Sequence, residues 1–399
     1  MDTVPNLRHL AALAEAGHSG SISSAARSVH LSQSAVTQGL SGIERMLGAE
    51  LFNRTTSGVF PTAAGRVYLE RVERGLAWLK QLEREASGRG GQQGLRRLLT
   101  ATQLRALITV VNTGSFSHAA NQLGLSQPSV QRAARELETV SGQELFRRSP
   151  FGVEPTWRAR QMARYANLAF DEIRQGFDEV RSLTGDKLVA SLAVGSLPLA
   201  RTRMVPQAVS RLLQVYPETR VKIVDGPYDE QLHALLHAQI HMIVGALRHP
   251  LPSPDIRQEV LFDDPLYIVV RPGHPLLAKR RASARELSRL DWIAPRERTP
   301  ARKAFSRFFQ REKLTPPEHV IECSSLVAIR SLLQATDRAA LLPARQVEVD
   351  VQAGLLAVMP TPLAGTTRAI GITTRNDWKP TAVQARFIEL LRDFSTQRD

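Results

Sequence analysis

Cysteine is almost absent from this chain. A single residue, Cys323, occurs among 399, so no disulfide can form within the chain and no metal site can rest on several thiolates. This composition is typical of a reducing compartment. One thiol with no second cysteine, close to apolar Ile321, indicates a buried small side chain rather than a redox sensor. We therefore expect a fold without disulfides, metals or other cofactors.

Long hydrophobic runs are also lacking. No stretch approaches the roughly 18 consecutive apolar residues of a membrane span. The start, MDTVPNLRHL, has neither the basic beginning nor the apolar core of a secretory signal. Hydrophobic residues make up 43% and charged residues 23%, which is an ordinary globular balance. We expect a cytoplasmic protein of two or three domains with no membrane partner.

The net charge of +14 favours a polyanionic partner but does not name one. Residues 1–183 carry 22 basic and 16 acidic side chains, and the rest of the excess lies in residues 184–399. Because the basic bias is spread along the chain, charge alone is weak evidence for nucleic acid.

One short phrase occurs twice, as LSQSAV and as LSQPSV. Around it, residues 21–62 align with residues 115–156 at a constant shift of 94 and without a gap. Identical pairs include Ala25/Ala119, Leu51/Leu145 and Pro61/Pro155. Upstream, LRHLAALAEAG matches LRALITVVNTG only if the first copy has three extra residues, 18–20. The repeat indicates duplication of a whole small domain.

Each copy has the pattern of a winged helix-turn-helix. In the first copy, LRHLAALAEAG predicts a helix that stops at Gly17, SSAARSV a short second helix, and HLS a tight turn. Ser32 can cap a third helix. The core face of that helix holds Val36, Leu40, Ile43 and Leu47. The segment LFNRTTSGVFPT predicts two short strands around a glycine turn.

The third helix of such a unit enters the major groove, with its first residues facing base edges. In the first copy these residues are Ser32, Gln33, Ser34, Thr37 and Gln38. In the second copy they are Ser126, Gln127, Pro128, Ser129, Gln131, Arg132 and Arg135. Gln and Arg suit base edges because each offers two hydrogen-bonding groups. Arg54 and Arg148, before the wings, are placed for phosphates. A polar helix face by itself could simply be exposed to solvent and bind nothing. The winged helix-turn-helix pattern around it favours DNA binding.

The two copies differ in charge. Residues 101–164 carry eight basic and four acidic side chains, whereas residues 1–68 carry five and four. Phosphate neutralisation dominates affinity for DNA, and Pro128 suits the first turn of a helix. We therefore expect the second copy to be the better reader, that is, the copy better suited to bind DNA and contact its bases. The first copy is either a second reader that lengthens the site or an internal dimerisation partner.

These segments resemble a known family. Both SISSAARSVHLSQSAVTQGLSGIERMLGAELFNRT with its PTAAG and GSFSHAANQLGLSQPSVQRAARELETVSGQELFRRS are similar to the DNA-binding domain of LysR-type transcriptional regulators. Members usually have one such domain, a long linker helix and an effector-binding domain, so the duplication departs from that plan. The resemblance implies double-stranded promoter DNA, RNA polymerase and a small-molecule effector as partners, and a homodimer or homotetramer.

A helix of linker length follows each unit, over residues 63–87 and 157–183, and GRGGQQG (88–94) reads as a flexible linker. In the family such helices pair between two subunits. Here they could pair internally as a pseudo-dimer, or one could pair between chains while the other is vestigial.

From residue 187 strands and helices alternate, which predicts a parallel sheet covered by helices. A second lobe begins near PLYIVVRPGHPLL, and the chain returns to the first lobe near residue 361. This half resembles the periplasmic-binding-protein-like effector domain of the same family. We thus predict a multidomain chain, with two all-α-dominated winged helix-turn-helix units and a two-lobed α/β effector domain.

The predicted boundaries follow this plan. They are 1–64 (first unit), 65–100 (linker helix and flexible linker), 101–156 (second unit), 157–184 (linker helix) and 185–399 (effector domain, with lobe I about 185–263 and 361–399 and lobe II about 264–360).

Ligands in such folds bind at the carboxyl ends of strands, often near helix N-termini. The predicted effector residues are Ser196, Leu197, Pro198, Gly226, Gly245, Arg248, Thr299, Pro300 and Ser324. An anion is favoured there, and Arg201, Arg296 or Arg298 could assist. The family's ligands include carboxylates and sugars, and the sequence does not choose between them.

His233, His237 and His241 are spaced four apart and could share a helical face that binds a metal. However, IHMIVGAL reads as a strand, so His241 is expected to leave that helix, and we predict no metal site. We interpret the chain as an effector-controlled, DNA-binding transcriptional regulator rather than an enzyme. A solute-binding protein and an enzyme of the same fold are the alternatives. The two winged units oppose the first, and no catalytic constellation supports the second.

Overall fold

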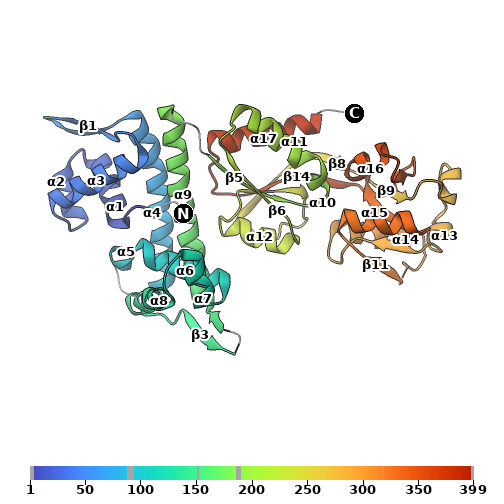
Figure 1. The fold of residues 1–399 in the computed structure, drawn as a ribbon, viewed down its shortest axis with the longest axis horizontal. Helices are drawn as coiled ribbons and strands as arrows, with labels where there is room; N and C mark the ends of the chain where they lie inside the picture. The colour runs from blue at the N-terminus through green and yellow to red at the C-terminus, as the bar shows by residue number, and fades with distance from the viewer. Residues whose placement is uncertain (1–3, 88–93, 151, 186–189, 318, 397–399) are drawn as a thin grey trace. The chain divides into compact units, whose positions relative to one another are not determined.

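The structure is a computed structural model that describes residues 4–87, 94–150, 152–185, 190–317 and 319–396 (Figure 1). The predicted flexible linker lies outside these residues except for Gly94. The chain divides into two compact units, of which the first is essentially Met1–Leu192 and the second most of the remainder. Among the described residues, none of the helices has the length and apolar character needed to cross a membrane.

Each element of the first copy recurs 94 residues later in the second. The first copy consists of α1 (Leu7–Ser19), α2 (Ile22–Ser28), α3 (Gln33–Leu47), β1 (Phe52–Thr55), β2 (Gly58–Pro61) and α4 (Ala63–Ser87). The second consists of α6 (Ala101–Thr113), α7 (Phe116–Leu123), α8 (Gln127–Ser141), β3 (Phe146–Ser149), β4 (Gly152–Pro155) and α9 (Trp157–Thr184), preceded by the short α5 (Leu95–Leu98). The duplicated segment therefore includes the long helix after each hairpin.

The expected three extra residues in the first copy do not exist. Both α1 and α6 have 13 residues, and they end at Gly20 and Gly114, which adopt the left-handed conformation. Gly17, predicted to end α1, lies inside the helix, where a Cβ atom would come within 2.8 Å of Leu69 on α4. The glycine thus permits close helix packing, and the sequence match that suggested an insertion was fortuitous.

The turn and the hairpin are built alike in both copies. Ser32 and Ser126 cap α3 and α8 by accepting a hydrogen bond from the amide three residues on, which the sequence predicted for Ser32. The four core positions predicted on α3 are all buried. Each hairpin is tied to the end of the first helix, because the Val59 amide donates to the Gly20 carbonyl and the Val153 amide to that of Gly114, at 2.9 and 3.0 Å.

The long helices α4 and α9 pack against each other within the chain (Figure 1). Tyr68 meets Phe177 edge to face at 5.5 Å between ring centroids, and Trp78 stacks on Tyr165 at 6.0 Å. Since low numbers on one helix meet high numbers on the other, the pair is antiparallel. Of the two arrangements open from the sequence, the structure has the internal one.

A buried ion cluster crosses this helix pair. The Arg71 side chain, only 1% exposed, donates through Nε and Nη2 to the Glu179 carboxylate at 2.8 and 2.6 Å, and through Nη1 to Glu172 at 2.9 Å. Arg74 donates to the other Glu172 oxygen at 2.8 Å. Burial alone would lower the pKa of Arg71, but hydrogen bonds to Glu179 and Glu172 outweigh it and raise that pKa above its ordinary value.

The second unit contains two five-stranded mixed sheets. The first sheet has the order β6 (Arg220–Val224), β5 (Ser191–Ser196), β7 (Met242–Ala246), β14 (Arg368–Arg375) and β8 (Ile256–Asp264), with α10 (Pro198–Thr202), α11 (Met204–Val215), α12 (Tyr228–Leu236) and α17 (Ala382–Thr396). The second has the order β11 (Val320–Glu322), β10 (Trp292–Ala294), β12 (Ala339–Pro343), β9 (Leu266–Val270) and β13 (Ala357–Val358), with η2 (Pro275–Ala278), α13 (Ala284–Leu287), α14 (Pro300–Arg311), α15 (Leu326–Ala335) and α16 (Ala344–Gln352). Each sheet forms one α/β lobe.

The chain passes between the lobes twice. It leaves the first sheet at Asp264, the end of β8, and enters the second at Leu266. It returns before Arg368, where β14 pairs antiparallel with β8 and places Arg368 opposite Asp264. The two connecting segments therefore run side by side at one point of the sheet.

We predict that Arg71→Met lowers the free energy of unfolding by about 3–5 kcal/mol, because it removes the buried cation from Glu179 and leaves Glu172 with Arg74 alone of its two cations. Arg84→Met, at an exposed position of the same helix, is the matched control and should change stability by less than about 0.5 kcal/mol. Denaturant unfolding of both variants checks this. Equal stabilities would contradict the importance of the cluster.

Candidate nucleic-acid interface and effector cavity

In both copies the predicted base-facing residues gather at the exposed start of the third helix. On α3, Thr37 is half-buried and the others are exposed, namely Ser32, Gln33, Ser34 and Gln38. On α8, Gln131 is half-buried and the others are exposed, namely Ser126, Gln127, Pro128, Ser129, Arg132 and Arg135. Arg54 and Arg148 are exposed on β1 and β3. Each set thus presents polar groups on one accessible end of a helix and its neighbouring hairpin.

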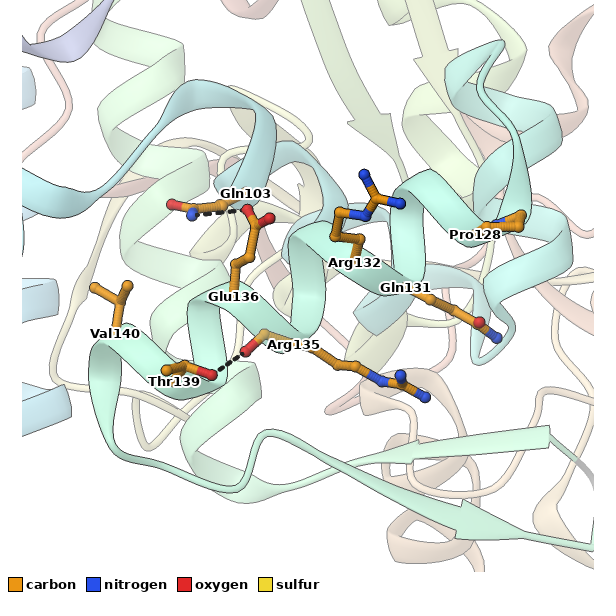
Figure 2. A pocket seen from close by; sticks show the side chains of 8 residues that line it. All are labelled: Gln103, Pro128, Gln131, Arg132, Arg135, Glu136, Thr139 and Val140. Atoms are coloured by element: carbon orange, nitrogen blue, oxygen red, sulfur yellow. Dashed lines mark hydrogen bonds between the residues drawn. The ribbon is translucent and has the colours of Figure 1, made fainter.

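The surface along α8 is hollowed, with a volume of about 630 Å³. Figure 2 shows that Gln131 and Arg135 leave the helix on one side and Arg132 on the other. Behind them, Gln103 of α6 donates to Glu136 at 3.5 Å. The outer part of the hollow therefore carries two guanidinium groups and an amide.

The two copies differ in how far these side chains are already engaged. In the first copy Gln33 accepts from Ser23 at 3.1 Å, and Arg54 lies 3.6 Å from Glu44. In the second copy the corresponding donors have no hydrogen-bond or ion-pair partner for their side chains within the part of the chain that the structure describes. These are Gln127, Gln131, Arg132, Arg135 and Arg148. The second copy offers more uncommitted donors and more positive charge.

The second unit has a cavity of about 640 Å³ between its two sheets. Most of the predicted effector residues line it, namely Leu197, Pro198, Gly226, Arg248, Thr299, Pro300 and Ser324. They follow β5, β6, β7, β10 and β11, so the carboxyl ends of strands from both lobes meet there. The first turns of α14 and α15 also border it, which brings backbone N–H groups to its wall.

Ser196 and Gly245 lie behind this wall rather than on it. Ser196 is fully buried, and its carbonyl accepts from Arg201 at 3.2 Å and from Gln231 at 3.3 Å. Gly245 has a φ of +148°, and a Cβ atom there would come within 2.5 Å of the Leu197 Cβ. Both residues therefore support the loop at Leu197 that lines the cavity.

The cavity is strongly positive. Of the residues that the structure describes, four arginines line it, Arg201, Arg248, Arg296 and Arg368, against a single carboxylate, Asp225. The Arg248 guanidinium lies over the Tyr228 ring, 4.2 Å from its centroid. Burial lowers the pKa of Arg248, and the charge of Arg368 lowers it further. Two partly buried cations thus share one largely apolar space.

Arg368 is the main lining residue that the sequence did not suggest. It begins β14 and donates to Asp264 at 2.9 Å, and both side chains are almost fully buried. Burial lowers the pKa of Arg368 and raises that of Asp264, although each charge favours the other. The Arg368 Nε has no hydrogen-bond partner among the described residues. The pair thus combines a cavity-lining cation with the crossing point of the two connecting segments.

The histidines and the cysteine do not form sites of their own. Helix α12 ends at Leu236, so His241 leaves it as expected, and its buried ring stacks on Trp378 at 6.1 Å between centroids. No cluster of three metal-binding side chains occurs among the described residues. Cys323, expected to be buried, is half-buried and lines the cavity, since it directly follows β11 where that strand ends at the cavity.

Comparison with known families identifies the combination of two helix-turn-helix copies with a two-lobed α/β unit. The family described as LysR substrate binding domain matches residues 185–395. The family described as bacterial regulatory helix-turn-helix protein, lysR family, matches residues 7–66 and again 101–160. The chain belongs to the LysR family of transcriptional regulators. Its two helix-turn-helix matches are 94 residues apart, the same shift that relates the structural elements of the two copies.

Two regulators differ in how much of this LysR-family chain they match. It is 30% identical to the HTH-type transcriptional regulator GalR of Pseudomonas putida over 99% of this chain and 98% of that relative. It is 27% identical to the HTH-type transcriptional regulator PcaQ of Agrobacterium fabrum over 73% of this chain and 93% of that relative. GalR therefore matches almost the entire chain, whereas about a quarter of it has no counterpart in PcaQ.

Solved structures share the fold of this LysR-family chain. A full-length OxyR variant from Pseudomonas aeruginosa gives a TM-score of 0.56 at 24% identity, over 73% of this chain and 96% of that one. Full-length CbnR complexed with its target DNA gives 0.51 at 22% identity, over 73% and 98%. At these identities the similarity establishes the architecture of a helix-turn-helix domain followed by a two-lobed α/β domain.

We predict that Gly245→Ala destabilises the second unit by about 1–3 kcal/mol, because a side chain at this φ is strained and its Cβ meets Leu197. Ser324→Ala, at an exposed lining position, is the control and should stay within about 0.5 kcal/mol. Thermal unfolding compares the two. If Gly245→Ala left the stability unchanged, the loop at Leu197 would have to move freely.

Proposed function

We propose that this chain is a sequence-specific DNA-binding regulator controlled by a small anionic effector. In this proposal two winged helix-turn-helix units bind double-stranded promoter DNA. A periplasmic-binding-protein-like domain binds the effector between its two lobes, and the DNA-bound regulator contacts RNA polymerase as a homodimer or homotetramer. The observation that carries the effector class is the cavity with four arginines and one carboxylate.

The readers are supported by geometry and charge. Each third helix presents polar side chains at its exposed start, which is the part of such helices that faces base edges. In the second copy these include the two arginines of Figure 2, which can each donate two hydrogen bonds to guanine. Arg54 and Arg148, on the strands after the third helices, are placed to reach phosphates.

An anionic effector would satisfy groups that the protein leaves unsatisfied. Arg248 and Arg368 are partly buried and repel each other, and Asp264 compensates directly only for Arg368. Burial disfavours such charges unless an opposite charge joins them. A carboxylate between them could also accept from the Arg368 Nε, and charge-assisted hydrogen bonds of this kind are strong. These unsatisfied cations favour a carboxylate over a neutral sugar.

Effector binding would act on the connecting segments. Arg368 and Asp264 lie opposite each other where β14 and β8 pair. An anion that draws Arg368 toward the cavity weakens its bond to Asp264 and favours one separation of the lobes over another. This is a shift between existing states, and its size equals the difference in effector affinity for those states.

The proposal is tested by selecting bound sequences from a random duplex library with the full chain, with and without small carboxylates. We expect a defined sequence to be enriched and its affinity to change with a bound carboxylate. Enrichment of no sequence would overturn the regulatory function.

We predict that Arg148→Ala weakens binding to the selected duplex and lowers the slope of log affinity against log salt by about 1, as the loss of one phosphate contact should. Arg289→Ala, at an exposed position of the effector unit, is the charge-matched control. Titrations at several salt concentrations measure both. An unchanged slope in Arg148→Ala would remove this residue from the interface.

We predict that Arg248→Gln weakens binding of carboxylates by about tenfold or more, since a charge-assisted hydrogen bond is worth about 1.5–3 kcal/mol. Calorimetry with a panel of small carboxylates and neutral sugars measures this, with Arg289→Gln as the control. Binding of sugars but not of carboxylates to the unsubstituted chain would exclude an anionic effector.

A further inference from the structure

The pair formed by α4 and α9 has an approximate two-fold symmetry within one chain. Residues of α4 correspond to those of α9 at a shift of 94, so the counterpart of Gly75 is Ala169. These two counterparts meet each other, because a Cβ atom on Gly75 would lie 3.1 Å from the Ala169 carbonyl oxygen. The helices therefore cross at equivalent positions. Each copy attaches at the start of its own helix, and the antiparallel pairing places the two copies at opposite ends.

The two symmetry-related halves of this helix pair have different chemistry. Arg71 corresponds to Tyr165, and Glu172 corresponds to Trp78, by the same shift. One half holds the buried contact between Arg71 and Glu172 at 2.9 Å. The other half holds the stack of Trp78 on Tyr165, with ring planes 20° apart. An ion pair on one side of the axis thus replaces an aromatic pair on the other.

This difference favours pairing of α4 with α9 over pairing of like helices from two chains. If α9 paired with another α9, Glu172 and Glu179 would face Tyr165 instead of Arg71. A buried carboxylate without its cation is strongly destabilising, and Glu172 is 3% exposed. If α4 paired with another α4, Arg71 would face Trp78 and Glu85, the counterparts of Glu172 and Glu179. The buried Glu172 has its cations only in the mixed pair.

The two readers carried by this pair are also unlike. The first offers Gln33, Thr37 and Gln38 and has no arginine on that face, whereas the second adds Arg132 and Arg135. Gln pairs well with adenine and Arg with guanine in the major groove. Readers with different donors recognise different bases.

We infer that one chain presents a complete two-fold pair of readers and recognises an operator whose two half-sites differ, about one helical turn apart. This inference rests on the proposed DNA-binding function. It differs from a pairing between subunits, in which each chain supplies one reader and the two half-sites are alike.

The test uses the full chain and the duplex that it selects from a random library. Hydroxyl-radical footprints are compared for the unsubstituted chain, Gln38→Ala and Arg132→Ala, with Arg289→Ala as the control. Both substituted side chains are exposed and unpaired among the described residues, so the fold should be retained. We expect Gln38→Ala to reduce protection from cleavage in one half-site and Arg132→Ala to reduce it in the other. Arg132→Ala should also bind the selected duplex about tenfold more weakly.

Two further duplexes, each with one half-site duplicated as a palindrome, should bind at least tenfold more weakly than the selected duplex. Two results would overturn the inference without affecting the proposed regulatory function. One is a variant that reduces protection equally in both half-sites, and the other is a palindrome that binds as tightly as the selected duplex. Selection of no sequence by the unsubstituted chain would instead overturn the proposed function itself.

Discussion

The contact of Arg71 with Glu172 and Glu179 fixes α4 on α9, and the architecture of the first unit depends on that fixed pair. The guanidinium group of Arg71 and the carboxylate of Glu172 are removed from water, so the free energy depends steeply on the register of the helices. A slip of one turn would leave charges unpaired. The same core holds Leu40 from the first copy and Leu137 from the second, so the duplicated domains form one packed body.

The duplication could be predicted from sequence because identities held one register over a long stretch. The true end of α1 could not, because Gly17 and Gly20 are both plausible stop signals. The choice is made by Leu69, some fifty residues later, which packs where a side chain on Gly17 would stand. Likewise, the sequence predicted two long helices but could not choose their partner. That choice depends on which residues of α9 face Arg71.

Most of the residues that line the cavity could be predicted from the sequence. They follow the carboxyl ends of strands, and the turns after parallel strands converge at one edge of a sheet. This pattern put Ser196 and Gly245 among the candidates, although Ser196 is fully buried and Gly245 packs against Leu197. It missed Arg368 because this residue begins a strand that pairs with β8 across more than a hundred residues. No local pattern carries that register.

Pairing within a single chain has a consequence for how the readers respond to dilution. A pair formed between subunits separates when the concentration falls below its dissociation constant. Here the effective concentration of α9 near α4 is set by the length of chain between them, which places tethered partners in the millimolar range. The two copies of the duplicated domain remain paired at any expression level. Scarcity of the protein therefore lowers the number of molecules without separating the two copies within each of them.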